Sequence, residues 1–401
     1  MTRVRFNDFT ITENEISCVF VKRGKLRKTE SPLYFKLSHA HRPHDDIIAL
    51  ALSTLFGKAY DDVHIDLPVS EHTLSKIHSF TGIRPSVKSI TSTAPTFPTT
   101  PNKVTLNFSG GLDSLSVKAL LPDDISLVSL DYGGLFARER VFFEEFSPYI
   151  VTTNLVDLKL NANTGVFMGI ASLLYKELLG TDYHAFGTPL EDLWSQKNWF
   201  FSQRNFCYPT PFIYAGIRNL NMLSFGMLGT TMALLTYRTY PELLEKSLKS
   251  LANVGDSKLY QKQLFLKVFD MKYKGIDFTM DGLTPPITPF NFGETHLIDL
   301  FSLYFVKYVG MEAAQILNRG IPESYVAMAD SVSLDFMEKL NPQFLPYVPH
   351  FIRDHALDVW EEAGIQHYSA KDWKELYAVL EFLSQWHPHL RPDAPLELPL
   401  P

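Results

Sequence analysis

The chain has 401 residues and a formal net charge of -7, with 45% hydrophobic and 20% charged residues. This composition is typical of globular proteins, excludes a fibrous or largely disordered chain, and, at a length beyond one usual core, predicts about two or three domains. The acidic balance disfavours nucleic acid as a partner, and the two cysteines, Cys18 and Cys207, can form neither a disulfide framework nor a four-cysteine zinc site, so we expect a reducing, cytoplasmic setting.

Residues 1–90 are predicted to form a small N-terminal α/β domain. Alternating hydrophobic residues predict three strands, at Val4–Phe9, Ile16–Val21 and Leu33–Leu37. Two acidic residues, Asp45 and Asp46, then precede an apolar run that ends near Gly57, which is typical of a helix. A second helix is expected after Ser70, whose hydroxyl can cap it.

Three histidines, His39, His41 and His44, lie before the first predicted helix. They are suitable zinc ligands by type, but Pro43 and the acidic residues that follow explain the segment as a loop leading into a helix. We therefore do not expect a metal site there.

Residues 91–102, TSTAPTFPTTPN, form the predicted boundary between domains. The stretch is rich in threonine and proline and lacks hydrophobic periodicity. A second domain is expected at residues 103–240.

The second domain begins with a strand, a glycine turn and a helix. Val104–Phe108 alternates like a strand, and a periodic apolar pattern resumes after Ser114. The adjacent glycines, Gly110 and Gly111, let the backbone approach a ligand closely, and the loop N–H groups and the positive helix end attract an anion such as pyrophosphate. The lysine of a Walker loop is absent.

The six residues of this turn resemble the SGGxDS pyrophosphate loop of the N-type ATP pyrophosphatases. They are Ser109, Gly110, Gly111, Leu112, Asp113 and Ser114. The resemblance implies that this loop binds the pyrophosphate end of ATP. By their chemistry, the two serines can donate to phosphate oxygens, and Asp113 can either cap the helix or hold a cation such as Mg²⁺. In that superfamily the α-phosphate of ATP is attacked by a carboxylate, amide or related oxygen, which gives an adenylate and releases pyrophosphate.

Two later strands are also predicted to end in polar residues. The predicted strand Ile125–Tyr132 has Asp131 near its end and is followed by Arg138. The predicted strand Tyr183–Thr188 has Gly187 near its end and is followed by Asp192. Ligands of open parallel sheets lie beyond the carboxyl ends of strands. We therefore predict Asp113, Arg138 and Asp192 as catalytic residues, and Asp131 and Gly187 as ATP-binding residues.

The alternation of strands and helices over residues 103–240 predicts an α/β fold with a doubly wound parallel sheet. The resemblance implies that this sheet is of the PP-loop ATPase type. A further strand is expected at Val151–Leu158 and a helix at Gly165–Leu179. From residue 241 to 401 the pattern predicts a helical C-terminal region, with a proline-rich tail after His387 as an extended or frayed end. The apolar run at 220–235 is short and interrupted, so we expect a core helix and no membrane partner.

The combined motifs resemble the 7-cyano-7-deazaguanine synthase group. That family adenylates a carboxylated deazaguanine, converts it to an amide with ammonia, and dehydrates the amide to a nitrile, as in queuosine biosynthesis. The resemblance implies ATP and Mg²⁺ as cofactors. The four-cysteine zinc site of that family cannot exist in a chain with two cysteines, so we expect no structural zinc. The chain is thus predicted to be a divergent, ATP-dependent ligase of this type.

The predicted substrates are a planar carboxylate and ammonia or an amine, and a protein acceptor is a further possibility. Tyr132 and Phe136 are candidates to stack on a heterocycle while Arg138 steadies the carboxylate, with Glu191 and Asp192 as further candidates; the alternative is that the two aromatics belong to the core. Three other functions stay open: an amide ligase resembling asparagine synthetase, a tRNA-modifying enzyme, and a non-catalytic nucleotide-binding subunit. The sequence does not decide the oligomeric state.

Overall fold

The computed structural model describes residues 2–25, 27–195, 211–274 and 283–392. Two compact units divide the chain. The first comprises Met1–Ser109, Asp123–Phe186 and Phe206–Leu220, and the second comprises Gly110–Pro122, Gly187–Asn205 and Asn221–Pro401. Each unit is therefore assembled from separated stretches of sequence.

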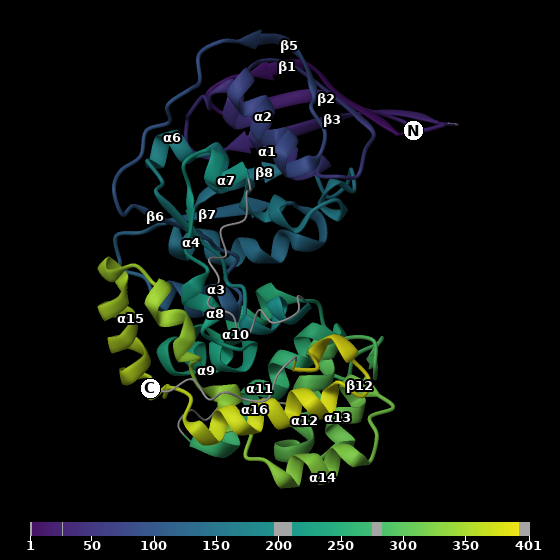
Figure 1. The fold of residues 1–401 in the computed structure, drawn as a ribbon, viewed down its shortest axis with the longest axis vertical. Coiled ribbons are helices and arrows are strands. Elements are labelled where there is room, and N and C mark those ends of the chain that lie inside the picture. The colour runs from purple at the N-terminus through teal and green to yellow at the C-terminus, as the bar shows by residue number, and fades with distance from the viewer. Residues whose placement is uncertain (1, 26, 196–210, 275–282, 393–401) are drawn as a thin grey trace. The chain divides into compact units, whose positions relative to one another are not determined.

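The first unit is built on a ten-stranded sheet with the strand order β10-β9-β6-β7-β8-β3-β2-β1-β4-β5 (Figure 1). The strands are β1 (Arg3–Ile11), β2 (Glu15–Arg23), β3 (Lys28–Leu37), β4 (Asp62–Ser70), β5 (Ser86–Thr91), β6 (Val104–Asn107), β7 (Ser126–Asp131), β8 (Tyr149–Thr153), β9 (Tyr183–Ala185) and β10 (Arg218–Asn219). Antiparallel pairing is confined to β1–β2, β2–β3 and β3–β8, whereas the remaining neighbours are parallel. The prediction of an α/β fold with a mostly parallel sheet is confirmed.

The compact units differ from the segments expected at 1–90, 103–240 and 241–401. The reason is the pairing of β3 with β8, in which Phe35 faces Thr153 and Leu37 faces Val151. This register joins the N-terminal strands to those that follow residue 103. The stretch 91–102 therefore connects two parts of one sheet.

Helices cover one face of this sheet. α1 (Asp45–Phe56) and α2 (Glu71–Thr81) pack against β4, and α5 (Ile170–Leu174) packs against β6, β7 and β8. α1 also contacts α5 and α7 (Pro211–Tyr214). Side chains such as Phe6, Phe35 and Ile65 are buried in this core.

The two N-terminal helices begin as their sequences predict. His44 caps α1 by accepting from the N–H of Asp46, and Ser70 caps α2 by accepting from the N–H of Thr73. The caps are coupled, because the buried carboxylate of Asp46 accepts from the backbone N–H of Ser70 at 3.0 Å and from its hydroxyl at 2.5 Å. α1 ends at Gly57, as expected.

Two local expectations in the first unit are corrected, and two strands were not expected. Gly165–Leu179 is not one helix, because a 3₁₀ turn at Gly165–Gly169 precedes α5, and α6 (Lys176–Leu179) follows a break at Tyr175. The strand expected at Val151–Leu158 is β8, which begins and ends earlier. β4 and β5, which the sequence analysis missed, follow α1 and α2.

The second unit is mainly helical (Figure 1). Its helices are α3 (Leu112–Ala119), α8 (Met222–Phe225), α9 (Gly229–Thr239), α10 (Leu244–Leu251), α11 (Ser257–Tyr273), α12 (His296–Val309), α13 (Met311–Leu317), α14 (Ser324–Ser331), α15 (His350–Glu362) and α16 (Ala370–Leu383). α11 packs between α9 and α12, where Phe265 contacts the rings of Phe301 and Phe305. The apolar run at 220–235, expected to be one core helix, is buried but is divided between α8 and α9.

The C-terminal segment is not frayed at His387, contrary to expectation. This residue is 6% exposed, and its Nε2 lies 2.6 Å from the buried Asp299 carboxylate of α12. A buried polar contact therefore holds the chain after α16. The last predicted tail residues, 393–401, lie outside the described part of the chain.

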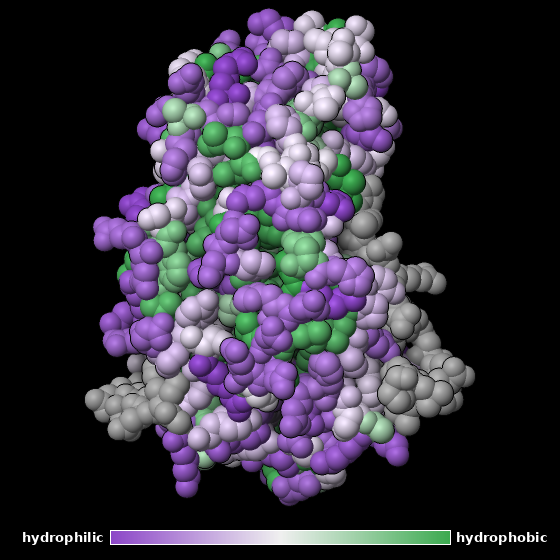
Figure 2. Space-filling model, turned by 90° about the vertical axis from the view of Figure 1, so that its left-hand side faces the viewer, coloured by the Kyte–Doolittle hydropathy of each residue, from purple (hydrophilic) through white to green (hydrophobic). Residues whose placement is uncertain are grey.

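The face shown in Figure 2 is dominated by hydrophilic residues, with hydrophobic residues between them. Within the described ranges, no helix combines the length and the apolar character that a bilayer crossing requires.

The first testable prediction concerns the coupled caps. Asp46→Ala should lower the free energy of unfolding by about 2–3 kcal/mol, because two buried donors of Ser70 lose a charged acceptor. Urea unfolding measures the effect. The control is Asp62→Ala, which removes an exposed ion pair with Arg3 and should cost no more than about 1 kcal/mol. Equal losses in both variants would contradict this account.

Candidate nucleotide site

The glycine loop contains a left-handed turn directly before α3. Gly110 has a φ of 76°, which glycine adopts without the penalty that a side chain brings. Gly111 is the N-cap of α3 and supplies no side-chain cap. The helix thus begins with a positively polarised first turn that its own N-cap side chain does not cover.

Two buried hydroxyls fix the loop within the second unit. Ser247 of α10 donates to the carbonyl oxygen of Gly110 at 2.9 Å, and Thr236 of α9 donates to that of Leu112 at 2.7 Å. Both loop carbonyls are thereby satisfied by neighbouring helices. The loop is held by tertiary contacts, which is how a ligand-binding backbone is preorganised.

The predicted serines differ in their surroundings. Ser114 is 4% exposed, and its hydroxyl donates to the carbonyl of Gly111 at 3.0 Å, so in this structure it stabilises the turn. Ser109 is exposed and is the last residue of the first unit before Gly110.

Asp113 is paired with a lysine that the sequence analysis missed. The Nζ of Lys262 lies 2.7 Å from Oδ1 of Asp113, and the lysine side chain is 6% exposed. Lys262 lies on α11, three residues after Leu259 and three before Phe265, which are both buried. The sequence signal that could have identified Lys262 is a lysine on the apolar stripe of a helix, since lysine is almost never buried without a partner.

Gly187 packs against the same loop. A Cβ atom at this position would lie 2.6 Å from the carbonyl carbon of Asp113 and 2.8 Å from the nitrogen of Ser114. These neighbours are backbone atoms of α3, which cannot rotate out of the way as a side chain can. Gly187 therefore acts through close packing that supports the loop.

Two acidic residues follow Gly187. Desolvation and the charge of Asp113 raise the pKa of Asp192 to about 6, against the opposing effects of Lys262 and Lys258, although Asp192 keeps access to solvent. Glu191 is 2% exposed and accepts from the N–H of Gly229, the first residue of α9, at 2.9 and 3.0 Å.

The two acids differ in their predicted ionisation. Burial, with a smaller effect of Asp192, raises the pKa of Glu191 to about 8. Asp192 therefore titrates just below neutral pH, whereas Glu191 holds its proton there. The structure thus brings Asp113, Gly187 and Asp192 together with Lys262 in the second unit.

The other predicted site residues belong to the first unit. Asp131, at the end of β7, accepts from Nε of Arg140 at 3.0 Å and from the N–H of Gly133 at 3.0 Å. Its carboxylate is thus used to hold the turn after β7. Arg138 was the arginine predicted from the sequence as a site residue in this segment, whereas Arg140 is the one that pairs with Asp131.

Arg138 lies on the 3₁₀ segment Gly134–Phe142. Its guanidinium is 5.6 Å from the ring centre of Phe136, which in turn contacts the Tyr132 ring edge to face at 5.5 Å. Burial raises the pKa of the Tyr132 hydroxyl well above its ordinary value. These three residues therefore form one aromatic and cationic cluster within the first unit.

The side chains of the histidines before α1 make different contacts. The His39 ring lies 4.2 Å from that of Tyr149, Nε2 of His41 lies 3.9 Å from Glu177, and His44 caps α1. Among the residues that the structure describes, no group of three or more histidine, cysteine or acidic side chains is arranged as a metal site. Cys207 lies outside those residues.

The chain matches no family model, no curated protein and no solved structure in comparisons with known proteins.

Gly187→Ala should destabilise the protein by about 2–3 kcal/mol, because its methyl group would overlap the backbone of α3. Urea unfolding tests this. Gly165→Ala is the matched control, since no atom lies within 4 Å of its added Cβ and its φ is not positive. Unchanged stability in Gly187→Ala would show that the close approach is absent.

The raised pKa of Glu191 predicts a pH dependence of stability. The folded state binds this proton more tightly than the unfolded chain, so the stabilisation is complete below the ordinary pKa of 4.5 and is lost as pH rises towards about 8. The loss is on the order of 1.4 kcal/mol per unit of pKa shift. Glu191→Gln should flatten the decline in unfolding free energy between pH 5 and 8.

Urea unfolding at several pH values provides this measurement. Glu312→Gln, which changes an exposed carboxylate in the first turn of α13, should leave the decline as it is in the unmodified protein. An unaltered decline in Glu191→Gln would mean that other groups cause it.

Proposed function

We propose that the protein is an ATP-dependent adenylating enzyme that activates a carboxylate and transfers the acyl group to ammonia or an amine. The observation that carries the proposal is the contact between buried Lys262 and Asp113 in the first turn of α3, directly after the two loop glycines. Backbone N–H groups, a helix N-terminus and a lysine are the groups that proteins use to bind phosphates. The SGGLDS resemblance supports the same ligand.

The residues present fit Mg²⁺ as the partner of ATP. Asp113 and Asp192 supply carboxylate oxygens, which Mg²⁺ prefers, and the charge of Asp113 acts on the pKa of Asp192. We assign Asp113 as the ligand, with Asp192 nearby. When bound with ATP, Mg²⁺ would neutralise negative charge on the phosphate oxygens.

The first chemical step is attack of a substrate carboxylate oxygen on the α-phosphorus of ATP. A new phosphorus–oxygen bond forms while the bond to the bridging oxygen breaks, and that electron pair leaves with pyrophosphate. Gly110 and Gly111 place the first turn of α3 against the departing group, and Lys262 supplies a positive charge beside it. Holding these charges in place before reaction is the contribution that lowers the barrier.

The second step is attack of the amine nitrogen on the acyl carbon, which expels AMP and releases one proton. Asp192 suits the role of base, because a pKa of about 6 leaves it ionised at neutral pH yet still able to accept a proton. The reaction then ends in an amide. Nitrile formation would require a further dehydration of that amide.

The substrate class that we propose is a deazaguanine-type planar acid, and its support is the family resemblance. ATP–pyrophosphate exchange against carboxydeazaguanine, nicotinate adenine dinucleotide and amino acids would identify the acid. Exchange that depends only on an amino acid would favour an amide ligase resembling asparagine synthetase.

Variants of the loop pair test the activity itself. Asp113→Asn and Lys262→Met should each reduce ATP–pyrophosphate exchange about 100-fold, because each removes a charge that acts on the phosphates. Lys267→Met, an exposed lysine on the same helix, is the matched control and should retain full exchange. Thermal unfolding checks that the variants are folded.

The products distinguish this proposal from its alternatives. AMP and pyrophosphate are the expected products. ADP and orthophosphate as the first products would contradict the proposal. ATP binding without turnover across the whole acid panel would instead identify a nucleotide-binding subunit.

A further inference from the structure

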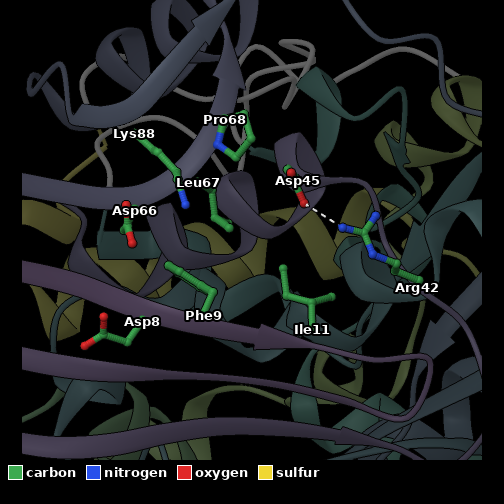
Figure 3. A pocket seen from close by; sticks show the side chains of 9 residues that line it. All are labelled: Asp8, Phe9, Ile11, Arg42, Asp45, Asp66, Leu67, Pro68 and Lys88. Atoms are coloured by element: carbon green, nitrogen blue, oxygen red, sulfur yellow. Dashed lines mark ion pairs between the residues drawn. The ribbon is translucent and has the colours of Figure 1, made fainter.

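The charged groups of a pocket in the first unit are balanced by the chain itself (Figure 3). The pocket has a volume of about 410 Å³. At one end, Nη2 of Arg42 lies 3.5 Å from Oδ1 of Asp45, and at the other, Lys88 accompanies Asp8 and Asp66. Each end therefore already holds a cation for its carboxylates.

Three histidine rings in the second unit lack this balance. They are His296, the first residue of α12, and His387 and His389, which flank Pro388 after α16. The ring centres of His296 and His389 lie 4.9 Å apart, and each lies 6.0 Å from the ring centre of His387. Imidazoles from the start of α12 and from the C-terminal segment thus form one cluster, the histidine cluster.

The buried carboxylate of Asp299 holds one member of the histidine cluster. Its Oδ2 accepts from Nε2 of His387 at 2.6 Å and from the N–H of Gly293 at 2.9 Å. Its Oδ1 accepts from Nδ2 of Asn318 at 2.8 Å. Three donors therefore already surround this carboxylate.

The other two members have no carboxylate of this kind. Nε2 of His296 and Nε2 of His389 are buried and make no hydrogen bond within the described residues. Burial and the charges of His389 and His387 lower the pKa of His296 to about 4, against a hydrogen bond to the backbone of Glu191. Burial and His387 also lower the pKa of His389. Both rings are therefore neutral at pH 7.

Side chains on the neighbouring elements compensate these rings poorly. Burial raises the pKa of Tyr325 on α14 well above its ordinary value, and Glu191 on the 3₁₀ turn Leu190–Ser195 holds its proton below about pH 8, so both are neutral in acid. Asp192 on the same turn interacts with Asp113 and with the lysines of α11. The remaining charged side chains near the ends of these elements are exposed, where solvent screens them; they are Glu294, Arg319, Glu381 and Arg391.

We propose that the histidine cluster is an acid-sensitive latch, in which protonation of His296 and His389 releases residues 387–391 from α12 and from the turn Leu190–Ser195. The 3₁₀ turn Pro388–Leu390 packs against that second turn, which carries Asp192. Each added proton places a positive charge among half-buried rings at 4.9–6.0 Å, so the charges repel and their desolvation is not repaid. The proposal is independent of the proposed function.

The direction of the pH dependence follows from the lowered pKa values. The released segment binds these protons near the ordinary pKa of 6.5, whereas the docked segment binds the proton of His296 only near 4. Docking is therefore fully stable above about pH 6.5 and loses stability as the pH falls towards about 4.

Hydrogen exchange of the full-length protein tests the latch. The amides of His387, Leu390 and Arg391 donate to backbone carbonyls within this segment and the end of α16, so their protection reports docking. Protection of these amides should fall about 10-fold between about pH 7.5 and about pH 5, after correction for intrinsic exchange, while that of α9 amides should not. Equal protection at both pH values would overturn the proposal.

Variants assign the effect to the histidine cluster. His296→Gln and His389→Gln each replace a titratable ring with a neutral polar side chain and should each reduce the fall to about threefold or less. His355→Gln, an exposed histidine on α15, is the matched control and should keep the full fall. A full fall in both cluster variants would mean that other groups, Asp299 included, cause it, and would contradict the proposal. If His296→Gln fails to fold, His389→Gln decides alone, because His389 lies outside α12.

Discussion

The contact of Lys262 with Asp113 is the interaction on which the proposed nucleotide site depends. The lysine side chain is 6% exposed and the aspartate side chain 25%. Removing such charges from water costs free energy that an ion pair often fails to recover, so a buried pair is weak support for stability alone. In the proposed function, an anionic ligand at the first turn of α3 would give the lysine a second partner.

Glycine positions allow the rest of the unit to approach this pair. Gly110 supplies the left-handed turn, and the missing side chain of Gly187 lets the segment before Asp192 reach the backbone of α3. The carboxylate of Asp192 is thereby brought within electrostatic range of Asp113 and Lys262, which sets its pKa. The close packing of Gly187 therefore also affects the pKa of Asp192.

The first unit shows how one strand pairing can reorganise a chain. Because β3 pairs with β8, the N-terminal strands extend the sheet that β6 and β7 belong to. Within this extension β1 and β4 are parallel neighbours. The N-terminal region thus forms one end of the sheet.

The sequence by itself determined the local features. Alternation identified β1, β2 and β3, acidic and serine starts identified α1 and α2, and the glycine motif identified the turn into α3, because these signals lie within a few neighbouring residues. Tertiary structure alone decided the β3–β8 register and the partner of Asp113. Lys262 is 149 residues away, and a contact at that separation depends on helix packing that no local pattern encodes. The breaks within Gly165–Leu179 and the burial of His387 have the same origin, since long-range packing there outweighed helix periodicity and the expectation of a loose end.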